Sequence, residues 1–296
     1  MPPSSGTMIT LNKDEPMNEI VNVTGNLSLD ELASKLGATS LNSKGPSIPT
    51  LKINSKGEDV NGVQIPLGAF FLNTPIEDRV YAKEGVRFHA LSNKIQYQHW
   101  GEEGLINKSI LLDWAKEEGR DMLGGYNCNM PTYEQSRNFT EEERKEYNGI
   151  DRYRIVRGLV SYTGKTAAGE ERTIENQPCV LSLKRKNYGP FYHDVLNRMG
   201  EKKVWDFENL LKADKVTSPK GATYYVMRFD PQFSKPVAMS QEIHDSLSAV
   251  LELIDGENSR IEDAWKKSNI QYVEELADEE VADTLEELEQ SFDEAS

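Results

Sequence analysis

Basic and aromatic side chains are interspersed in the middle of this chain, between residues 152 and 203. This stretch holds eleven Lys and Arg side chains against five Asp and Glu side chains, with tyrosines and phenylalanines among them. Cations of this kind neutralise phosphate groups and release counterions, while exposed rings stack on nucleobases of any identity. The pattern is therefore typical of a surface that binds single-stranded nucleic acid.

The candidate contact residues fall into two sets, both on segments where we expect β-strands or the turns beside them. The later set consists of Arg152, Tyr153, Arg154, Arg157, Tyr162, Lys184, Arg185, Lys186 and Tyr188. The earlier set consists of Arg79, Arg87, Lys94, Tyr97 and Trp100. A small barrel of such strands would bring both sets to one groove. In the competing interpretation the aromatic side chains pack in the hydrophobic core of the sheet, and the Lys and Arg side chains are ordinary surface residues.

Motifs for catalysis are weak by comparison. Gly164-Lys165-Thr166 resembles the end of a phosphate-binding loop, but residue 159 is Leu where that motif requires Gly. Lys165 also lies between two expected strands, whereas a phosphate loop opens a helix, so a hairpin turn is predicted here. The four histidines have no Ser, Cys or carboxylate at catalytic spacing. We therefore expect a protein without enzymatic activity and without a cofactor.

Metal chemistry has one weak candidate set. The two cysteines, Cys128 and Cys179, lack further ligands at metal-binding spacing and predict neither a zinc site nor a disulfide. Acids that would share a face of an expected helix are Asp113, Glu117, Glu118 and Asp121. A nuclease that uses them with magnesium is the least favoured alternative, because a solvated helix face explains them more simply.

The negative charge of the chain is concentrated at its C-terminal end. Residues 271–296 contain eleven acids and no base, whereas residues 51–235 contain 26 acids and 28 bases. The tail is also amphipathic, because Leu276, Val281, Leu285, Leu288 and Phe292 recur at helical spacing. It is therefore suited to occupy a basic groove by Coulomb attraction or to bind a partner, with Leu285, Leu288 and Phe292 as the contact residues.

Apolar periodicity divides the chain into four regions. Residues 1–48 are polar and predict a flexible arm with one short helix at 28–36. Residues 49–235 alternate apolar and polar side chains in several short runs, as strands with one wet face do. Residues 236–270 favour two amphipathic helices, and residues 271–296 form the acidic amphipathic tail.

The expected fold class is α+β, mainly antiparallel β, with a small barrel or sheet of the oligonucleotide-binding kind. Strands are predicted over residues 50–55, 63–72, 79–83, 86–91, 94–100, 151–162, 178–183 and 222–229, and helices over 110–122 and 191–200. No run approaches the roughly 18 apolar residues that a membrane-spanning helix needs. The N-terminus has no secretory signal pattern, so we expect a cytoplasmic protein without membrane contact.

A mostly β, basic and aromatic body followed by an acidic C-terminal segment resembles the single-stranded DNA-binding proteins of bacteriophages. The likeness covers the plan of residues 50–296, with Phe292 among the acids of residues 288–296. Residues 51–110 also resemble uncharacterised phage proteins sometimes grouped with them. This resemblance implies an oligonucleotide-binding barrel that coats single strands during DNA replication and recombination, in the host cytoplasm. It also implies a tail that recruits replication or recombination proteins.

We therefore expect a sequence-tolerant single-stranded DNA-binding protein whose tail competes for the DNA groove or recruits partners. The alternative is a structural or adaptor protein, for instance a virion or scaffold component. In that case the C-terminal amphipathic helices bind a partner or one another, which would produce a homo-oligomer.

Overall fold

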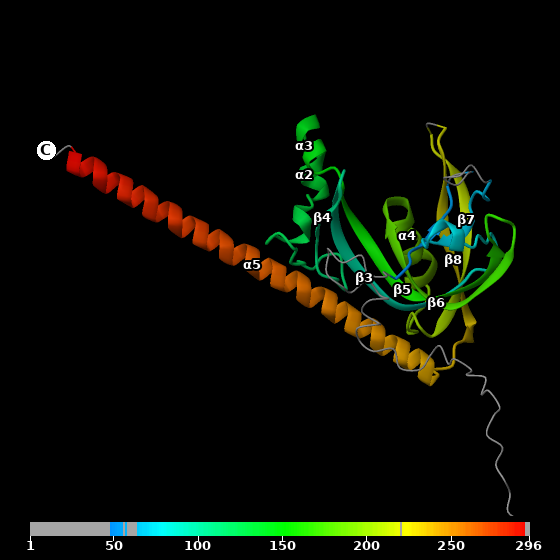
Figure 1. Ribbon diagram of the computed structural model, residues 1–296. Coiled ribbons are helices and arrows are strands. Elements are labelled where there is room, and N and C mark those ends of the chain that lie inside the picture. The colour runs from blue at the N-terminus through cyan, green and yellow to red at the C-terminus, as the bar shows by residue number, and fades with distance from the viewer. Residues whose placement is uncertain (1–47, 56, 58–63, 220, 294–296) are drawn as a thin grey trace, which may run out of the picture.

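The computed structural model describes residues 48–55, 57, 64–219 and 221–293, with the backbone alone for Glu146 and residues 271–293. The predicted N-terminal helix at 28–36 lies outside these residues. A curved, antiparallel sheet forms the body, a helical lobe stands beside it, and a long C-terminal helix crosses it (Figure 1). The predicted α+β class with mainly antiparallel strands is confirmed.

The strands are β1 (Leu51–Ile53), β2 (Phe70–Leu72), β3 (Arg87–Gly101), β4 (Gly104–Lys108), β5 (Ile150–Lys165), β6 (Glu171–Lys184), β7 (Phe207–Thr217) and β8 (Thr223–Pro236). The α-helices are α2 (Tyr133–Arg137), α3 (Glu141–Glu146), α4 (Tyr188–Phe191) and α5 (Gln241–Asp293). Short 3-10 turns are η1 (Ile76–Asp78), η2 (Asn127–Asn129) and η3 (Arg185–Asn187), and η4 (Tyr192–Leu196) is a π-helical turn.

The long strands β3 and β5 form the centre of the main sheet. They pair antiparallel from Arg87 opposite Ser161 to His99 opposite Ile150. The strand order is β6-β5-β3-β7-β8, with β4 paired to the last residues of β3 and β7 to its first. Among the described residues no ladder joins β6 to β8, so the sheet is open and the expected barrel is not closed.

A bulge in β3 decides which side chains share a face. Between Ala90 and Ser92 the register with β5 shifts by one residue. The even-numbered side chains before the bulge, such as Phe88, therefore share a face with the odd-numbered side chains after it, such as Asn93. Gly158 of β5 lies at this point, where a Cβ would come within 2.2 Å of a backbone carbonyl oxygen of β3. Only glycine allows the two strands to approach so closely.

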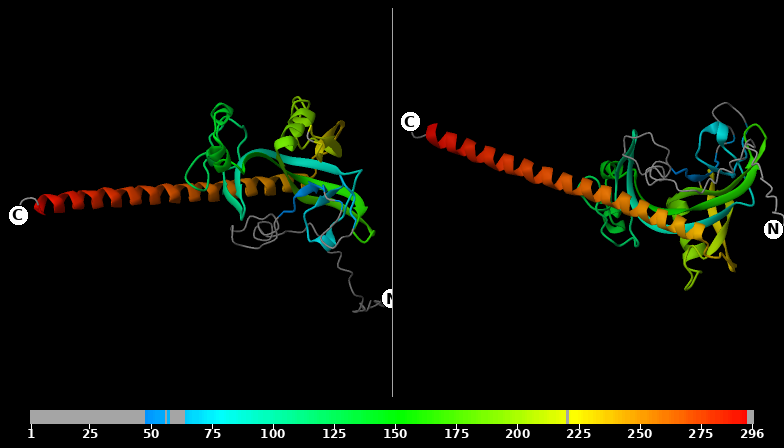
Figure 2. Two further views of the ribbon diagram at one scale, coloured as in Figure 1. Left: turned by 90° about the horizontal axis from the view of Figure 1, so that it is seen from above. Right: turned by 60° about the horizontal axis from the view of Figure 1, so that its bottom comes forward.

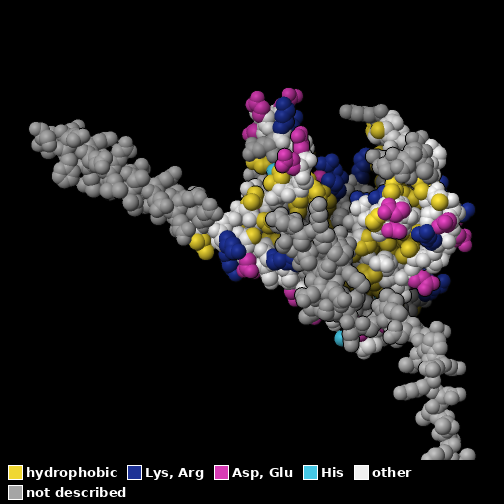
Figure 3. All heavy atoms as spheres, in the orientation of Figure 1, with side chains coloured by type: hydrophobic (Ala, Val, Ile, Leu, Met, Phe, Trp, Pro, Cys, Tyr) yellow, Lys and Arg dark blue, Asp and Glu magenta, His cyan; other side chains and the backbone are white. Residues whose placement is uncertain are grey.

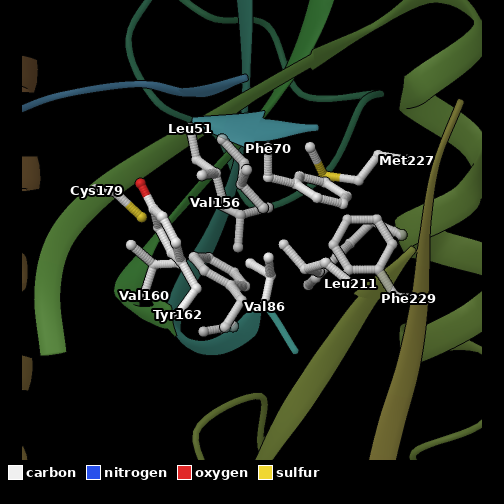
Figure 4. Close-up of a cluster of buried hydrophobic side chains, with 14 of the residues drawn as sticks. Leu51, Phe70, Val86, Val156, Val160, Tyr162, Cys179, Leu211, Met227 and Phe229 are labelled. Carbon is white, nitrogen blue, oxygen red and sulfur yellow. The ribbon is translucent and has the colours of Figure 1, made fainter. Parts of the chain in front are cut away.

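The two faces of β5 have different covers. Val156 and Val160 lie on what we call the core face, where they pack with Leu51 of β1 and Phe70 of β2 in the main hydrophobic core (Figure 4). β1 pairs antiparallel with β2, which covers residues 70–72 of the strand predicted over 63–72, whereas residues 64–69 lie outside it. The opposite face, which carries Ile155 and which we call the helix face, lies beneath α5.

α5 is one continuous helix of 53 residues, where the sequence predicted two short helices and a separate tail helix. Its Ile254 packs against Tyr153 and Leu111, and Asn258 bonds both the N–H and the carbonyl of Leu111. These contacts hold the helix on both sides of Gly256. The helix then projects beyond the body (Figures 1 and 2). Within the described part of the chain, no helix combines the length and apolar character needed to cross a membrane.

A buried ion network fastens α5 to the sheet. The Glu257 carboxylate accepts hydrogen bonds from Arg157 at 2.7 Å, Lys108 at 2.8 Å and Gln96 at 3.0 Å. Burial opposes ionisation of this carboxyl, but the attraction of Lys108 and Arg157 outweighs it and lowers the pKa of Glu257 to about 2. The network therefore stabilises α5 on the helix face.

Residues 109–149 form the lobe between β4 and β5, which we call the 109–149 lobe. The helix predicted over residues 110–122 is not formed. Leu112 instead exchanges two backbone hydrogen bonds with Ile95, and the buried carboxylate of Asp121 accepts three N–H groups of the following loop. These tertiary bonds take the backbone groups that a helix would use. α2 and α3 each begin at a capping box, with Thr132 and Thr140 as the N-caps.

Changing Glu257 to Gln should lower the free energy of unfolding at pH 7 by about 3 kcal/mol, because Lys108 and Arg157 lose their carboxylate. Since the native pKa of Glu257 lies below its ordinary value of 4.5, this stabilisation is fully present above that pH. It is lost as the pH falls toward 2. Urea unfolding at a series of pH values should show wild type and variant converging in acid. Glu252→Gln, at an exposed position of the same helix, is the control, and a gap independent of pH would contradict this account.

Both thiols should be inert in the native protein. Cys128 and Cys179 are free and buried, and burial raises the pKa of both, that of Cys128 to about 12. Because the thiolate is the reactive form, neither should react with an aromatic disulfide reagent at pH 8, and both should react in guanidinium chloride. Release of one equivalent from the native protein would show that a thiol is accessible.

Candidate nucleic-acid interface

Two arginines and a tyrosine form a cluster on the core face of β5. The guanidinium carbons of Arg152 and Arg154 lie 4.8 Å and 4.9 Å from the centroid of the Tyr188 ring. Two residues beyond Arg154 on β5, Val156 belongs to the main hydrophobic core. Ile95 lies opposite Arg154 on β3 and packs beneath the 109–149 lobe. We call Arg152, Arg154 and Tyr188 the arginine–tyrosine cluster. It lies at the junction of two hydrophobic clusters.

The segment after β6 positions Tyr188. Arg185, the first residue of η3, has a positive φ of 49° and turns the chain out of β6 toward α4. Asn187 accepts a backbone N–H of β8 at 2.9 Å. In η4, the π-helical turn that takes the place of the helix predicted over 191–200, Asp194 forms a two-pronged ion pair with Arg228 of β8 at 2.6 and 2.8 Å. β8 thereby holds Tyr188 over β5.

Two buried arginines of β5 have opposite electrostatic surroundings. Arg154 and Arg157 are 5% and 8% exposed, and one nitrogen of each has no hydrogen-bond partner. The charge of Arg157 is balanced by Glu257 across the helix face. Arg154 donates to the side-chain oxygen of Asn93 at 2.8 Å, and no carboxylate in the described residues lies within ion-pair distance.

Neutral partners compensate only part of the Arg154 charge. Removing an ion from water costs several kcal/mol, whereas a desolvated cation over an aromatic ring recovers roughly 2 kcal/mol. Burial lowers the pKa of Arg154, and the neighbouring charge of Arg152 acts in the same direction. A guanidinium nevertheless keeps its proton at physiological pH. Arg154 is therefore a buried cation without a counter-charge among the described residues.

A second cation–ring pair lies beside the arginine–tyrosine cluster. The ammonium of Lys186, two residues before Tyr188, is 3.4 Å from the centroid of the Tyr224 ring on β8. Tyr192 is 46% exposed and close enough to affect the pKa of Arg154. Figure 3 shows Lys and Arg side chains in the hollow between the lobe of α2 and α3 and the part that carries β7 and β8.

Tyr192 and Tyr224 are absent from the predicted contact sets. Two signals in the sequence point to them. Tyr192 follows Tyr188 by four residues, which places both on one side of a helical turn, and Tyr224 is the first ring of a predicted strand. Neither signal says that the segment after β6 folds against β8.

Lys184 and Arg185 are directed elsewhere. Both bind the carboxylate of Asp151, at 3.2 and 2.9 Å, and the ammonium of Lys184 lies 5.1 Å from the Tyr153 ring on the helix face. Tyr153 is opposite Lys184 in the β5–β6 ladder, so the two side chains share a face. The structure therefore divides the later set between the two faces of β5.

Besides Arg154, four predicted contact residues are buried. Tyr97 and Tyr162 donate their hydroxyls to backbone carbonyls, and burial raises the pKa of Tyr162 to about 12. Figure 4 shows Tyr162 within the main core. Tyr153 and Arg157 lie beneath α5. For these four side chains the packing interpretation describes the structure, because none presents a free ring or charge to solvent.

The remaining residues of the earlier set are each engaged locally. Arg79 forms a cation–π contact with the Phe71 ring, while Arg87 and Lys94 form ion pairs with Glu208 and Asp113. Trp100 is exposed and donates to Gln98. They therefore provide positive and aromatic surface around the sheet rather than parts of the arginine–tyrosine cluster.

The candidate catalytic features do not come together. Asp113 binds Lys94, whereas Asp121 is buried within its own loop. Among the residues that the structure describes, no group of three His, Cys, Asp or Glu side chains could hold a metal ion. Lys165 ends β5 at the hairpin to β6, which confirms the predicted turn.

Known proteins offer no guide to this arrangement. No protein-family model, curated protein or solved structure matches this chain. The interpretation of the interface therefore depends on the chemistry of its own residues.

Proposed function

We propose that this protein binds single-stranded DNA without sequence preference and without catalysis. The observation that carries the proposal is the joining of cations and rings on one surface, by Arg152 and Arg154 around Tyr188 and by Lys186 on Tyr224. These residues come from β5, from the segment after β6 and from β8. Residues far apart in the sequence thus supply both the phosphate contacts and the stacking surfaces that a single strand requires.

The chemistry of these side chains favours tolerance of sequence. Arg152 and Lys186 are exposed and suited to phosphate oxygens, while the exposed ring of Tyr192 is open to stacking. Stacking accepts every base because each has a π-face. We further propose that the open sheet is a variant of the oligonucleotide-binding barrel, with β3 and β5 as the floor of the DNA path.

The C-terminal helix supports a role for the tail outside the body. α5 docks on the helix face, opposite the arginine–tyrosine cluster, and residues 271–293 extend it by about 35 Å at 1.5 Å per residue. While that helix is intact, the acids lie away from the cluster of the same molecule. Recruitment of replication or recombination proteins through Leu285, Leu288 and Phe292, whose side chains are outside the described part, suits this geometry. Competition for the DNA path would act on a neighbouring molecule.

The length of the projecting helix also favours the second candidate, a structural or adaptor protein. Figure 1 shows that α5 extends beyond the body, and this length of helix is suited to pack against a partner or another copy of the chain. Light scattering would distinguish the two functions. A discrete assembly that disappears on truncation after Ile270, together with absent DNA binding, would favour the adaptor.

Replacing Arg152 or Lys186 by Met should weaken binding to a labelled oligo-dT and reduce the slope of log K against log salt by about 0.7 each, the value for one lost phosphate contact. Fluorescence anisotropy at several salt concentrations measures both quantities. Lys266→Met, at an exposed position of α5, is the matched control. Undetectable binding at low salt, with the tail removed, would eliminate the proposed function.

Truncation after Ile270 should raise the affinity for oligo-dT several-fold at low salt, because it removes eleven acids that repel the strand. The gain should shrink as salt shortens the range of the charges. The same titration with the full chain and the truncated chain measures it. Equal affinities at low salt would show that the tail has no electrostatic role in DNA binding.

A further inference from the structure

Arg154 differs from every other buried cation described in this chain in what surrounds its charge. Arg157, three residues away, shows how the fold balances a buried guanidinium, by placing Glu257 2.7 Å from it. No such carboxylate faces Arg154, although its exposed fraction is 5% and its Nε has no hydrogen-bond partner among the described residues. An uncompensated ion at such a position indicates that its counter-charge comes from a ligand.

We infer that Arg154 is the centre of a built anion site that takes one phosphate group of a bound ligand. Arg152 provides a second guanidinium, which is exposed and likewise has no carboxylate within ion-pair distance in the described residues. Guanidinium groups present fixed pairs of N–H donors that match two oxygens of a phosphate. Asn93 fixes one end of Arg154 at 2.8 Å and leaves the Nε donor for the anion.

The ring beside this site indicates which phosphate it takes. Tyr188 lies over both guanidiniums, and the exposed ring of Tyr192 is adjacent. A nucleotide unit of a strand carries both a phosphate and a nucleobase. Its phosphate would reach the two arginines while a nucleobase stacks on a tyrosine ring. This assignment to a phosphodiester rests on the proposed function. The anion site itself rests on the burial and the unpartnered Nε of Arg154 and on the neighbouring guanidinium of Arg152.

Access to Arg154 requires Tyr188 to move. The half-buried ring covers the guanidinium at 4.9 Å, and it belongs to a short segment fastened to β8 at Asn187 and Asp194. Rotation of the side chain would open the site without unfolding that segment. One phosphate would then be held at a fixed position, whereas contacts to exposed lysines are interchangeable.

Thermal unfolding in inorganic phosphate, against chloride of equal ionic strength, tests the site without DNA. We expect the melting temperature of the wild type to rise by about 3 °C or more once phosphate exceeds its dissociation constant about tenfold. Arg154→Met should abolish this rise, and in chloride it should melt at or above the wild-type temperature, because it removes an uncompensated charge. Arg154→Lys should fold and bind phosphate at least fivefold more weakly.

Arg157→Met is the matched control, because it removes the other buried guanidinium of the same strand. It should melt well below wild type, since Glu257 loses one of its two cationic partners, yet keep the full response to phosphate. An equal phosphate response in wild type and Arg154→Met would overturn the inference. A loss of stability in Arg154→Met as large as that in Arg157→Met would also overturn it, because Arg154 would then be a structural residue.

A thymidine dinucleotide and its uncharged methylphosphonate analogue identify the source of the phosphate. Stabilisation by the dinucleotide alone supports a phosphodiester site, whereas equal effects of both would overturn that assignment. Oligo-dT binding without any phosphate response would refute the anion site and leave the proposed function intact. A phosphate response without oligo-dT binding would keep the site, assign it to a smaller phosphate-bearing ligand and refute the proposed function.

Discussion

The antiparallel pairing of β3 with β5 is the constraint on which the other elements depend. β6 extends one edge of this pair, β7 and β4 share the other edge, and α5 covers one face. Because strand side chains alternate between faces, this pairing sorts every residue of β5 into one of two surroundings. Arg154 and Arg157 fall on opposite faces for this reason.

The two faces solve the problem of a buried charge differently. On the helix face the Glu257 carboxylate of α5 forms ion pairs with Arg157 and Lys108. The same contacts therefore attach the helix to the sheet and balance the two positive charges. On the core face, the described residues that meet the charge of Arg154 are Asn93, through its amide, and Tyr188, through its ring. The first arrangement stabilises the folded chain by itself, and the second leaves a binding capacity for an anion.

Charge is also separated along the length of the molecule. The 61 residues after position 235 hold eighteen acids and three bases, whereas the body is nearly neutral overall. Since α5 is docked by Glu257 and continues without a break, its acids beyond residue 270 are carried away from the sheet. A body with local positive charge and a distant acidic helix can therefore engage two different partners at once. This arrangement is compatible with both the DNA-binding and the adaptor proposal.

The sequence by itself determined the class of the fold, the long strands around Tyr97 and Arg154, the hairpin at Lys165 and the separation of an acidic helical end, because these follow from local periodicity and charge. Tertiary structure alone decided the rest. The bulge between Ala90 and Ser92 reverses which residues share a face, and loop bonds to Asp121 replace the helix predicted over 110–122. Tyr224 joins Lys186 only because β8 fastens the segment after β6. Whether an arginine is balanced or left without a counter-charge depends on which residues fold against it, and no local pattern encodes that.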